Sequence, residues 1–112
     1  MRMWMIKPEL MCMKHIVGEH GEIHKHLHNF VKKHSISGRV KASNVQIEPS
    51  SMKKRHDELA KYLKNHKSPY FQPNLSYLSP NERYAVVDQS QSIQDLINRC
   101  PDCREKIKGK LN

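Results

Sequence analysis

The segment HIVGEHGEIHKHLH, residues 15–28, contains five histidines and two glutamates. Imidazole and carboxylate groups transfer protons near neutral pH and also bind metal ions, so this segment is the first candidate for chemistry. Residues three, four or seven positions apart share a face of an α-helix. One such stripe holds four ionisable residues: His15, Glu19, Glu22 and His26.

The hydrophobic pattern places this stripe on the first of three predicted helices. Apolar residues recur at helical spacing and Pro8 suits a first helical position, so a long amphipathic helix is expected over residues 8–33. His20 and His24 fall among the apolar residues and are expected to be buried or half-buried, with the stripe on the other flank. The residues expected to face the core are Leu10, Met13, Ile16, Val17, Ile23, Leu27, Phe30 and Val31.

Two further helices are expected after Gly38 ends the first one and an extended connection leads to Pro49. The second should cover residues 51–65, with Ser50 or Ser51 as its cap. Its buried residues would be Met52, Leu59, Ala60 and Leu63, and its solvated residues Lys53, Lys54, Arg55 and Lys61. The third should cover residues 90–99, and Pro101 should separate it from a final turn that carries Ile107.

These patterns predict an all-α fold: a compact single domain, residues 1–112, of three main helices. Residues 65–88 contain three prolines and are expected to form a long ordered loop between helices two and three. Its aromatic residues, with Trp4, are expected to pack in the core, although they could also stack on a base. These aromatic residues are Tyr70, Phe71, Tyr77 and Tyr84.

The charge balance predicts a polyanionic partner. Twenty lysines and arginines against eleven acidic residues give a formal net charge of +9, which favours nucleic acid first and an anionic membrane surface second. No window is long and apolar enough to cross a bilayer, and MRMWMI is too short for a secretory signal. Three cysteines, an odd number, suggest a reducing compartment, so a cytoplasmic location is expected.

The ionisable stripe allows three interpretations. It could be a solvated face with weak local pairs between glutamate and histidine. It could bind a metal, but HGEIH is not the HExxH arrangement of zinc peptidases, and one helix seldom completes a coordination shell. It could perform acid–base chemistry beside a nucleophile from elsewhere in the chain. A further possible metal site, CPDC at residues 100–103, is half of a zinc site with no evident second half, so we expect reduced thiols and no metal.

Four segments together resemble the pyrimidine-dimer DNA glycosylases, the family whose archetype is bacteriophage endonuclease V. They are MRMW at the start, KHIVGEHGEIHKH on the first helix, KKRHDELAKYLK on the second and RCPDC near the end. The resemblance extends over nearly the whole chain. It implies a compact helical fold and a DNA glycosylase that also cleaves abasic sites, without a cofactor.

The resemblance also implies site residues. In this family the nucleophile is the α-amine of the first residue, and a glutamate on the first helix assists it. Aligned through His15, these positions are Met1 and Glu22, and the bulky Arg2 is expected to prevent removal of Met1. Supporting roles would fall to His15, Glu19 and His26. An α-amine titrates near pH 8, so a useful fraction is unprotonated at neutral pH.

The implied partner is double-stranded DNA with a damaged, modified or abasic nucleotide, bound by a monomer with no membrane partner. Basic residues would hold its phosphates: Arg2, Lys25, Lys32, Lys33, Arg39 and Lys41. The chain departs from the archetype in its C-terminal segment, which has no aromatic residue, and at Gly21, where the archetype has arginine. Abasic-site cleavage is therefore a firmer expectation than excision of a pyrimidine dimer. The alternatives are a non-catalytic basic DNA-binding protein and a metal-dependent nuclease that uses the stripe.

Overall fold

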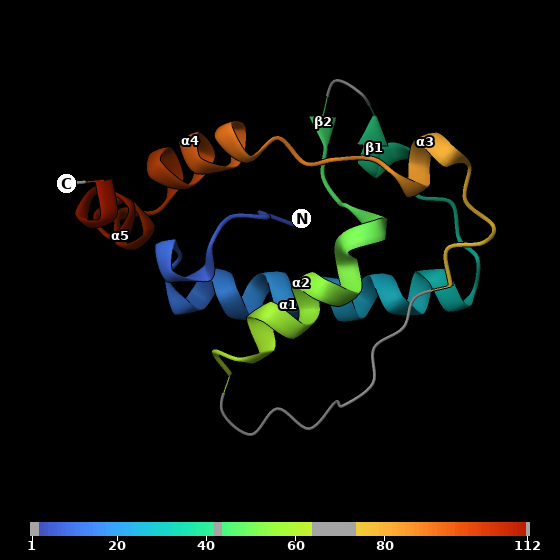
Figure 1. Ribbon diagram of the computed structural model, residues 1–112, viewed down its shortest axis with the longest axis horizontal. Helices are drawn as coiled ribbons and strands as arrows, with labels where there is room; N and C mark the ends of the chain where they lie inside the picture. The colour runs from blue at the N-terminus through green and yellow to red at the C-terminus, as the bar shows by residue number, and fades with distance from the viewer. Residues whose placement is uncertain (1–2, 42–43, 64–73, 112) are drawn as a thin grey trace.

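The computed structural model describes residues 3–41, 44–63 and 74–111 of the chain (Figure 1). The fold is mostly helical, as expected, but the described part contains five α-helices rather than three. The helices are α1 (Met13–Val31), α2 (Met52–Ala60), α3 (Pro80–Arg83), α4 (Gln89–Arg99) and α5 (Pro101–Leu111), and an antiparallel pair is formed by β1 (Val40–Lys41) and β2 (Asn44–Val45). Three 3-10 turns complete the described elements: η1 (Pro8–Leu10), η2 (Ser37–Arg39) and η3 (Pro49–Ser51).

The first predicted helix is divided in two. Pro8 begins η1 as its first residue, and Met11 and Cys12 then take extended backbone angles before α1 begins. At the other end, Lys33 adopts a left-handed conformation with φ of 57°, which stops the helix well before Gly38. The helix is therefore shorter than residues 8–33 at both ends: it begins after the extended Met11 and Cys12, and its end is set by this backbone reversal rather than by the glycine.

The orientation of α1 differs from the prediction. Ile16, Ile23 and Phe30 are buried as expected, at intervals of seven residues. Three other residues predicted to be buried are largely exposed: Met13 at 49%, Val17 at 53% and Val31 at 68%. The helix is rotated so that the ionisable stripe, and not this second apolar edge, faces the rest of the protein. The reason lies on α2, which packs against α1 (Figure 1).

Helix α2 follows η3 and carries one buried charge. Met52 and Leu59 pack in the core as predicted, whereas Arg55, expected in solvent, is only 3% exposed. Ser51 occupies the N-cap position as predicted, but its side chain makes no capping hydrogen bond, and the Ser50 hydroxyl donates to the carbonyl of Arg83. The helix ends at Ala60, before the predicted end at residue 65. Residues 64 and 65 of the predicted helix lie outside the described range.

The N-terminal segment is anchored in the core, and Met5 within it adopts a left-handed backbone conformation with φ of 57°. The amide of Met3 donates to the carbonyl of Gln46 at 2.7 Å, and Met3 itself is fully buried. Trp4 and Ile6 are also buried in the same hydrophobic cluster. The predicted extended connection contains the short hairpin β1–β2, in which Val40 pairs with Val45. The start of the chain is thereby fixed against the middle of the molecule.

The C-terminal part has the predicted break at Pro101, but the expected final turn is a helix of eleven residues, α5. Helix α4 ends at Arg99, Pro101 begins α5, and Ile107 is buried. The predicted loop of residues 65–88 includes α3, whose start is stabilised by reciprocal hydrogen bonds between Ser79 and Glu82. Residues 65–73 of that loop lie outside the described residues. None of the described helices has the length and apolar character needed to cross a membrane.

Candidate functional site

The ionisable stripe of α1 points into the protein. Glu19, Glu22 and His26 are only 1%, 8% and 2% exposed, and His15 is half-buried. The interpretation of a solvated face is therefore wrong. Buried ionisable groups are costly unless they have partners or a function, so each member of the stripe needs its own account.

Glu19 is held by a buried ion pair with Arg55 of α2. The Arg55 Nε lies 2.6 Å from Glu19 Oε2 and its Nη2 lies 2.8 Å from Oε1, so both carboxylate oxygens are bound. Arg55 Nη1 also donates to the carbonyl of Ile6 and to Glu58. Burial alone would lower the pKa of Arg55, but the hydrogen bonds and charge of Glu19 raise it above its usual value. Glu19 is thus a structural anchor between helices rather than a free acid or base.

His15 is drawn away from the stripe by two thiols. Its Nδ1 lies 3.2 Å from the Sγ of Cys12 and 3.5 Å from the Sγ of Cys103, and its ring meets Trp4 edge-on. Burial lowers the pKa of His15, while the charge of Glu19 raises it by a smaller amount. His15 and Glu19 were predicted to support Glu22, but in the structure their side chains contact the thiols and Arg55 instead.

Glu22 and His26 remain together as a candidate acid–base pair. The Lys25 Nζ lies 3.3 Å from Glu22 Oε1. Neither ring nitrogen of the buried His26 has a hydrogen-bond partner among the described residues. Burial lowers the pKa of His26 most, followed by the charge of Arg39; Glu22 acts in the opposite direction, and the positive amino terminus lowers it further. The site thus combines a carboxylate with a neutral imidazole one helical turn away.

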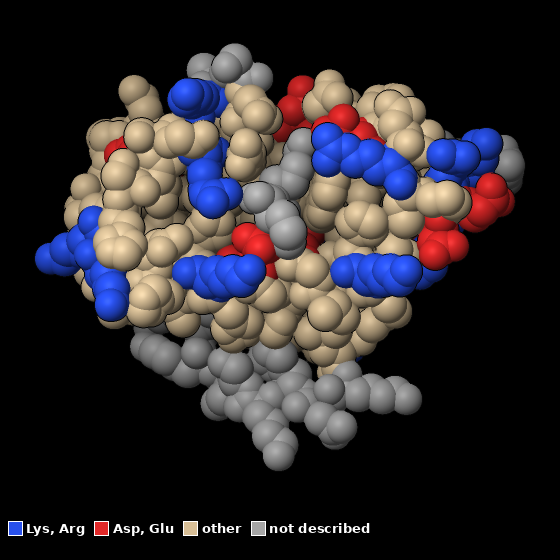
Figure 2. Space-filling view, turned by 180° about the vertical axis from the view of Figure 1, so that it is seen from behind, with Lys and Arg blue, Asp and Glu red and all other residues tan. Residues whose placement is uncertain are grey.

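The predicted DNA contacts are mostly exposed. Lys25 has a side chain that is 76% exposed, and Arg39 is half-buried near His26. The other described candidates are exposed: Lys32, Lys33 and Lys41. Met1 and Arg2 lie outside the described residues. Figure 2 shows lysine and arginine side chains spread over one face, with acidic atoms near its centre.

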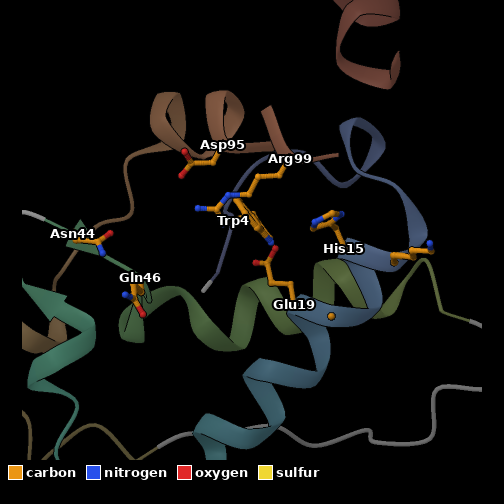
Figure 3. A pocket seen from close by; sticks show the side chains of 9 residues that line it. Trp4, His15, Glu19, Asn44, Gln46, Asp95 and Arg99 are labelled. Atoms are coloured by element: carbon orange, nitrogen blue, oxygen red, sulfur yellow. The ribbon is translucent and has the colours of Figure 1, made fainter. Parts of the chain in front are cut away.

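A pocket of about 490 Å³ opens beside the first turns of α1. Trp4 stands in its middle, Glu19 rises toward it from α1, and Arg99 reaches across from α4 (Figure 3). Asn44 and Gln46 line the opposite side, next to the hydrogen bond that fixes Met3. The volume and mixed polar lining are suitable for one small organic group such as a nucleotide.

A histidine cluster was not predicted from the sequence. His24 Nε2 lies 3.3 Å from His20 Nε2 and 3.1 Å from His56 Nε2, and the rings of His20 and His56 are stacked. The four-residue spacing of His20 and His24 could have suggested a pair, but His56 comes from α2. The two α1 histidines are half-buried, as expected, although they pack against imidazole rather than only against apolar side chains.

The aromatic residues divide between two roles. Trp4 is 8% exposed and belongs to the core, as predicted. Tyr77 is half-buried and its hydroxyl donates to the carbonyl of His34, whereas Tyr84 is 63% exposed, so core packing is wrong for Tyr84. Tyr70 and Phe71 lie outside the described residues.

Comparison with known proteins identifies no relative from which a function could be transferred. The chain matches no protein-family model, no curated protein and no solved structure. The geometry of the site itself must therefore support any functional assignment.

Proposed function

We propose that this protein is a DNA glycosylase and abasic-site lyase that acts through the α-amine of Met1, with Glu22 as the acid–base residue. The observation that carries the proposal is the burial of Glu22 beside a neutral His26 on the face of α1 that is turned into the protein. A carboxylate in such a place is suited to proton transfer and to stabilising a cation.

The fixed position of Met3 supports the amine as the nucleophile. Its amide donates to the carbonyl of Gln46, so the described chain is held in place two residues after Met1. The positive amino terminus also contributes to lowering the pKa of His26, one turn from Glu22. An amine with a pKa near 8 needs no metal or cofactor to act as a nucleophile.

The chemistry follows from these groups. The amine attacks C1′ of an abasic sugar in its aldehyde form, and loss of water gives an imine. Removal of a C2′ proton then breaks the C3′–O bond, which releases the 3′ phosphate as the leaving group. Water finally hydrolyses the imine and restores the amine. Glu22 would move the protons in these steps and stabilise the cationic imine.

The basic surface would hold the DNA. Exposed Lys25 and the lysines near the end of α1 can neutralise phosphates without reading sequence, which suits an enzyme that acts on damage in any context. Reaching C1′ in a duplex requires distortion of the DNA, and the pocket around Trp4 could receive a displaced nucleotide. Excision of pyrimidine dimers or another modified base is the finer part of this proposal.

A borohydride trapping experiment tests the proposal. The protein is incubated with duplex DNA that contains one abasic site, and borohydride is added to reduce any imine to a stable covalent adduct. We expect an adduct, with the modified residue mapped by mass spectrometry to Met1, and no adduct after selective acetylation of the α-amine. Binding of abasic DNA without any trapped adduct would instead support the alternative of a non-catalytic DNA-binding protein.

The alternative of a metal-dependent nuclease built on the stripe has less support. Within the described residues, the side chains close enough to share a metal ion do not include Glu19, Glu22 or His26. Glu19 is already bound on both oxygens by Arg55. Cleavage that stops on addition of EDTA, with no adduct formed, would favour this alternative over the lyase.

A further inference from the structure

The start of α1 and the junction of α4 and α5 meet at a cluster of three thiols and one imidazole. Cys12 and His15 stand at the start of α1, and Cys100 and Cys103 stand at the junction of α4 and α5. One donor atom from each residue lies within 4.8 Å of every other. The sequence interval between the two pairs is more than eighty residues, so the cluster is created by the fold.

The separations within the cluster match those of a tetrahedral metal site. The Sγ atoms of Cys12 and Cys100 are 3.7 Å apart, and His15 Nδ1 lies 3.2 and 3.5 Å from the Sγ atoms of Cys12 and Cys103. With Zn–S and Zn–N bonds of ordinary length, a tetrahedral ion would separate two sulfurs by about 3.8 Å and a sulfur from a nitrogen by about 3.6 Å. Little rearrangement is needed to receive the ion.

Backbone amides are arranged to stabilise sulfur as a thiolate. The amide of Cys12 donates to the Sγ of Cys103 at 3.2 Å, and the amide of Cys103 donates to the Sγ of Cys100 at 3.4 Å. Hydrogen bonds to ligating atoms orient them and favour the charged form that binds metal. The second of these bonds lies within CPDC, where a spacing of two residues brings both thiols to one ion.

The surroundings favour a structural rather than a catalytic ion. Cys12 and Cys103 are 6% and 0% exposed, and the ring of Trp4 packs against that of His15. A disulfide does not explain the geometry, because bonded sulfurs are about 2.05 Å apart and all three cysteines are free. With four protein ligands no coordination position would remain for a substrate.

We propose that Cys12, His15, Cys100 and Cys103 bind one zinc ion that joins the start of α1 to the α4–α5 junction. Three thiolates and one imidazole form a soft donor set that selects zinc over magnesium or calcium. This proposal differs from the prediction made from the sequence, which was reduced thiols without a metal. The ion would also hold His15 and Trp4, which both line the pocket, and so stabilise that region independently of the proposed lyase activity.

Metal analysis of the purified full-length protein tests the proposal. We expect about one zinc per chain by mass spectrometry of the metal content, and release of that zinc when an organomercurial reagent blocks the thiols. Cobalt exchanged into the protein should show the absorption of a tetrahedral ion together with sulfur-to-cobalt charge transfer. Folded protein that holds no zinc and takes up no cobalt would overturn the proposal, as would bound iron in place of zinc.

Two variants separate this site from the histidine cluster. Cys100→Ser changes a half-buried ligand and is expected to lower zinc affinity at least about 100-fold, since even the loss of a partner behind a ligand costs 10–100-fold. His24→Asn, in the cluster with His20 and His56, should retain both the zinc and the charge-transfer band. Loss of metal in His24→Asn with retention in Cys100→Ser would contradict the assignment. If Cys100→Ser does not fold, the cobalt spectrum of the unaltered protein distinguishes the two clusters. Cobalt bound by the thiols gives sulfur-to-cobalt charge transfer, whereas cobalt bound by imidazoles alone does not.

Discussion

Arg55 of α2 donates to both carboxylate oxygens of Glu19 of α1, and both side chains are almost completely buried. The pair connects two helices through residues that are 36 positions apart in the sequence. It also fixes the rotation of α1, because a carboxylate bound to a buried arginine must face α2. The same rotation turns Glu22 and His26 inward, where the proposed chemistry takes place.

Breaking this ion pair on one side should destabilise the fold strongly. Arg55→Met leaves the buried Glu19 carboxylate without its partner and is expected to lower the free energy of unfolding by about 3–5 kcal/mol. Glu19→Gln should cost less, because Arg55 keeps its ion pair with Glu58. The double variant should lose less free energy of unfolding than the two single variants lose together, because it contains neither the Glu19 nor the Arg55 charge. Chemical denaturation measures all three. Lys53→Ala, which removes an exposed pair with Asp57, is the control, with an expected change of about 0–1 kcal/mol.

Glu22→Gln should abolish most of the lyase activity while DNA binding is retained. The amide keeps the size of the side chain but cannot transfer a proton, so the rate of strand cleavage at an abasic site is expected to fall about 10²–10⁴-fold. Single-turnover cleavage and a binding titration are measured on the same protein. Glu58→Gln, on α2, is the matched control and should cleave normally. Equal rates for Glu22→Gln and the unaltered protein would remove Glu22 from the mechanism.

His26 should make stability depend on pH. Its pKa in the fold is lowered from 6.5, chiefly by burial, so the unfolded chain binds the proton more tightly than the folded one. The stabilising contribution is complete above pH 6.5 and is lost as the pH falls through the lower folded pKa. The free energy of unfolding, measured across this range, should fall less toward acid pH in His26→Leu than in the unaltered protein. His28→Leu changes an exposed histidine of the same helix and is the control: the decrease in the free energy of unfolding toward acid pH should match that of the unaltered protein.

Lys25→Ala should weaken DNA binding by about the same factor for any sequence. If this exposed side chain neutralises one phosphate, its removal should lower the slope of log affinity against log salt by about 1. Fluorescence anisotropy at several salt concentrations gives this slope. Lys61→Ala is the comparison, because Lys61 is also exposed but stands at the C-terminal end of α2 rather than on α1. An unchanged slope in Lys25→Ala would exclude this lysine from the DNA interface.

Much of the helical layout could be predicted from local sequence. The apolar spacing from Ile16 to Phe30 and the proline at residue 101 located α1 and the break between α4 and α5. These features depend on backbone geometry and on neighbours within one or two turns, so they are readable without the fold. The helix ends were less predictable, because the left-handed backbone at Lys33 has no strong local signal.

By itself the sequence determined the helical periodicity, the basic charge of the chain and the position of a carboxylate-bearing stripe on its first long helix. Tertiary structure decided which side of that helix is inside. Periodicity identifies which side chains share a face, but two faces of α1 carried apolar residues, and the choice between them depended on Arg55 from another helix. Likewise, CPDC had no partner in its own segment, and Cys12 with His15 reached it only when the start of α1 packed against the α4–α5 junction.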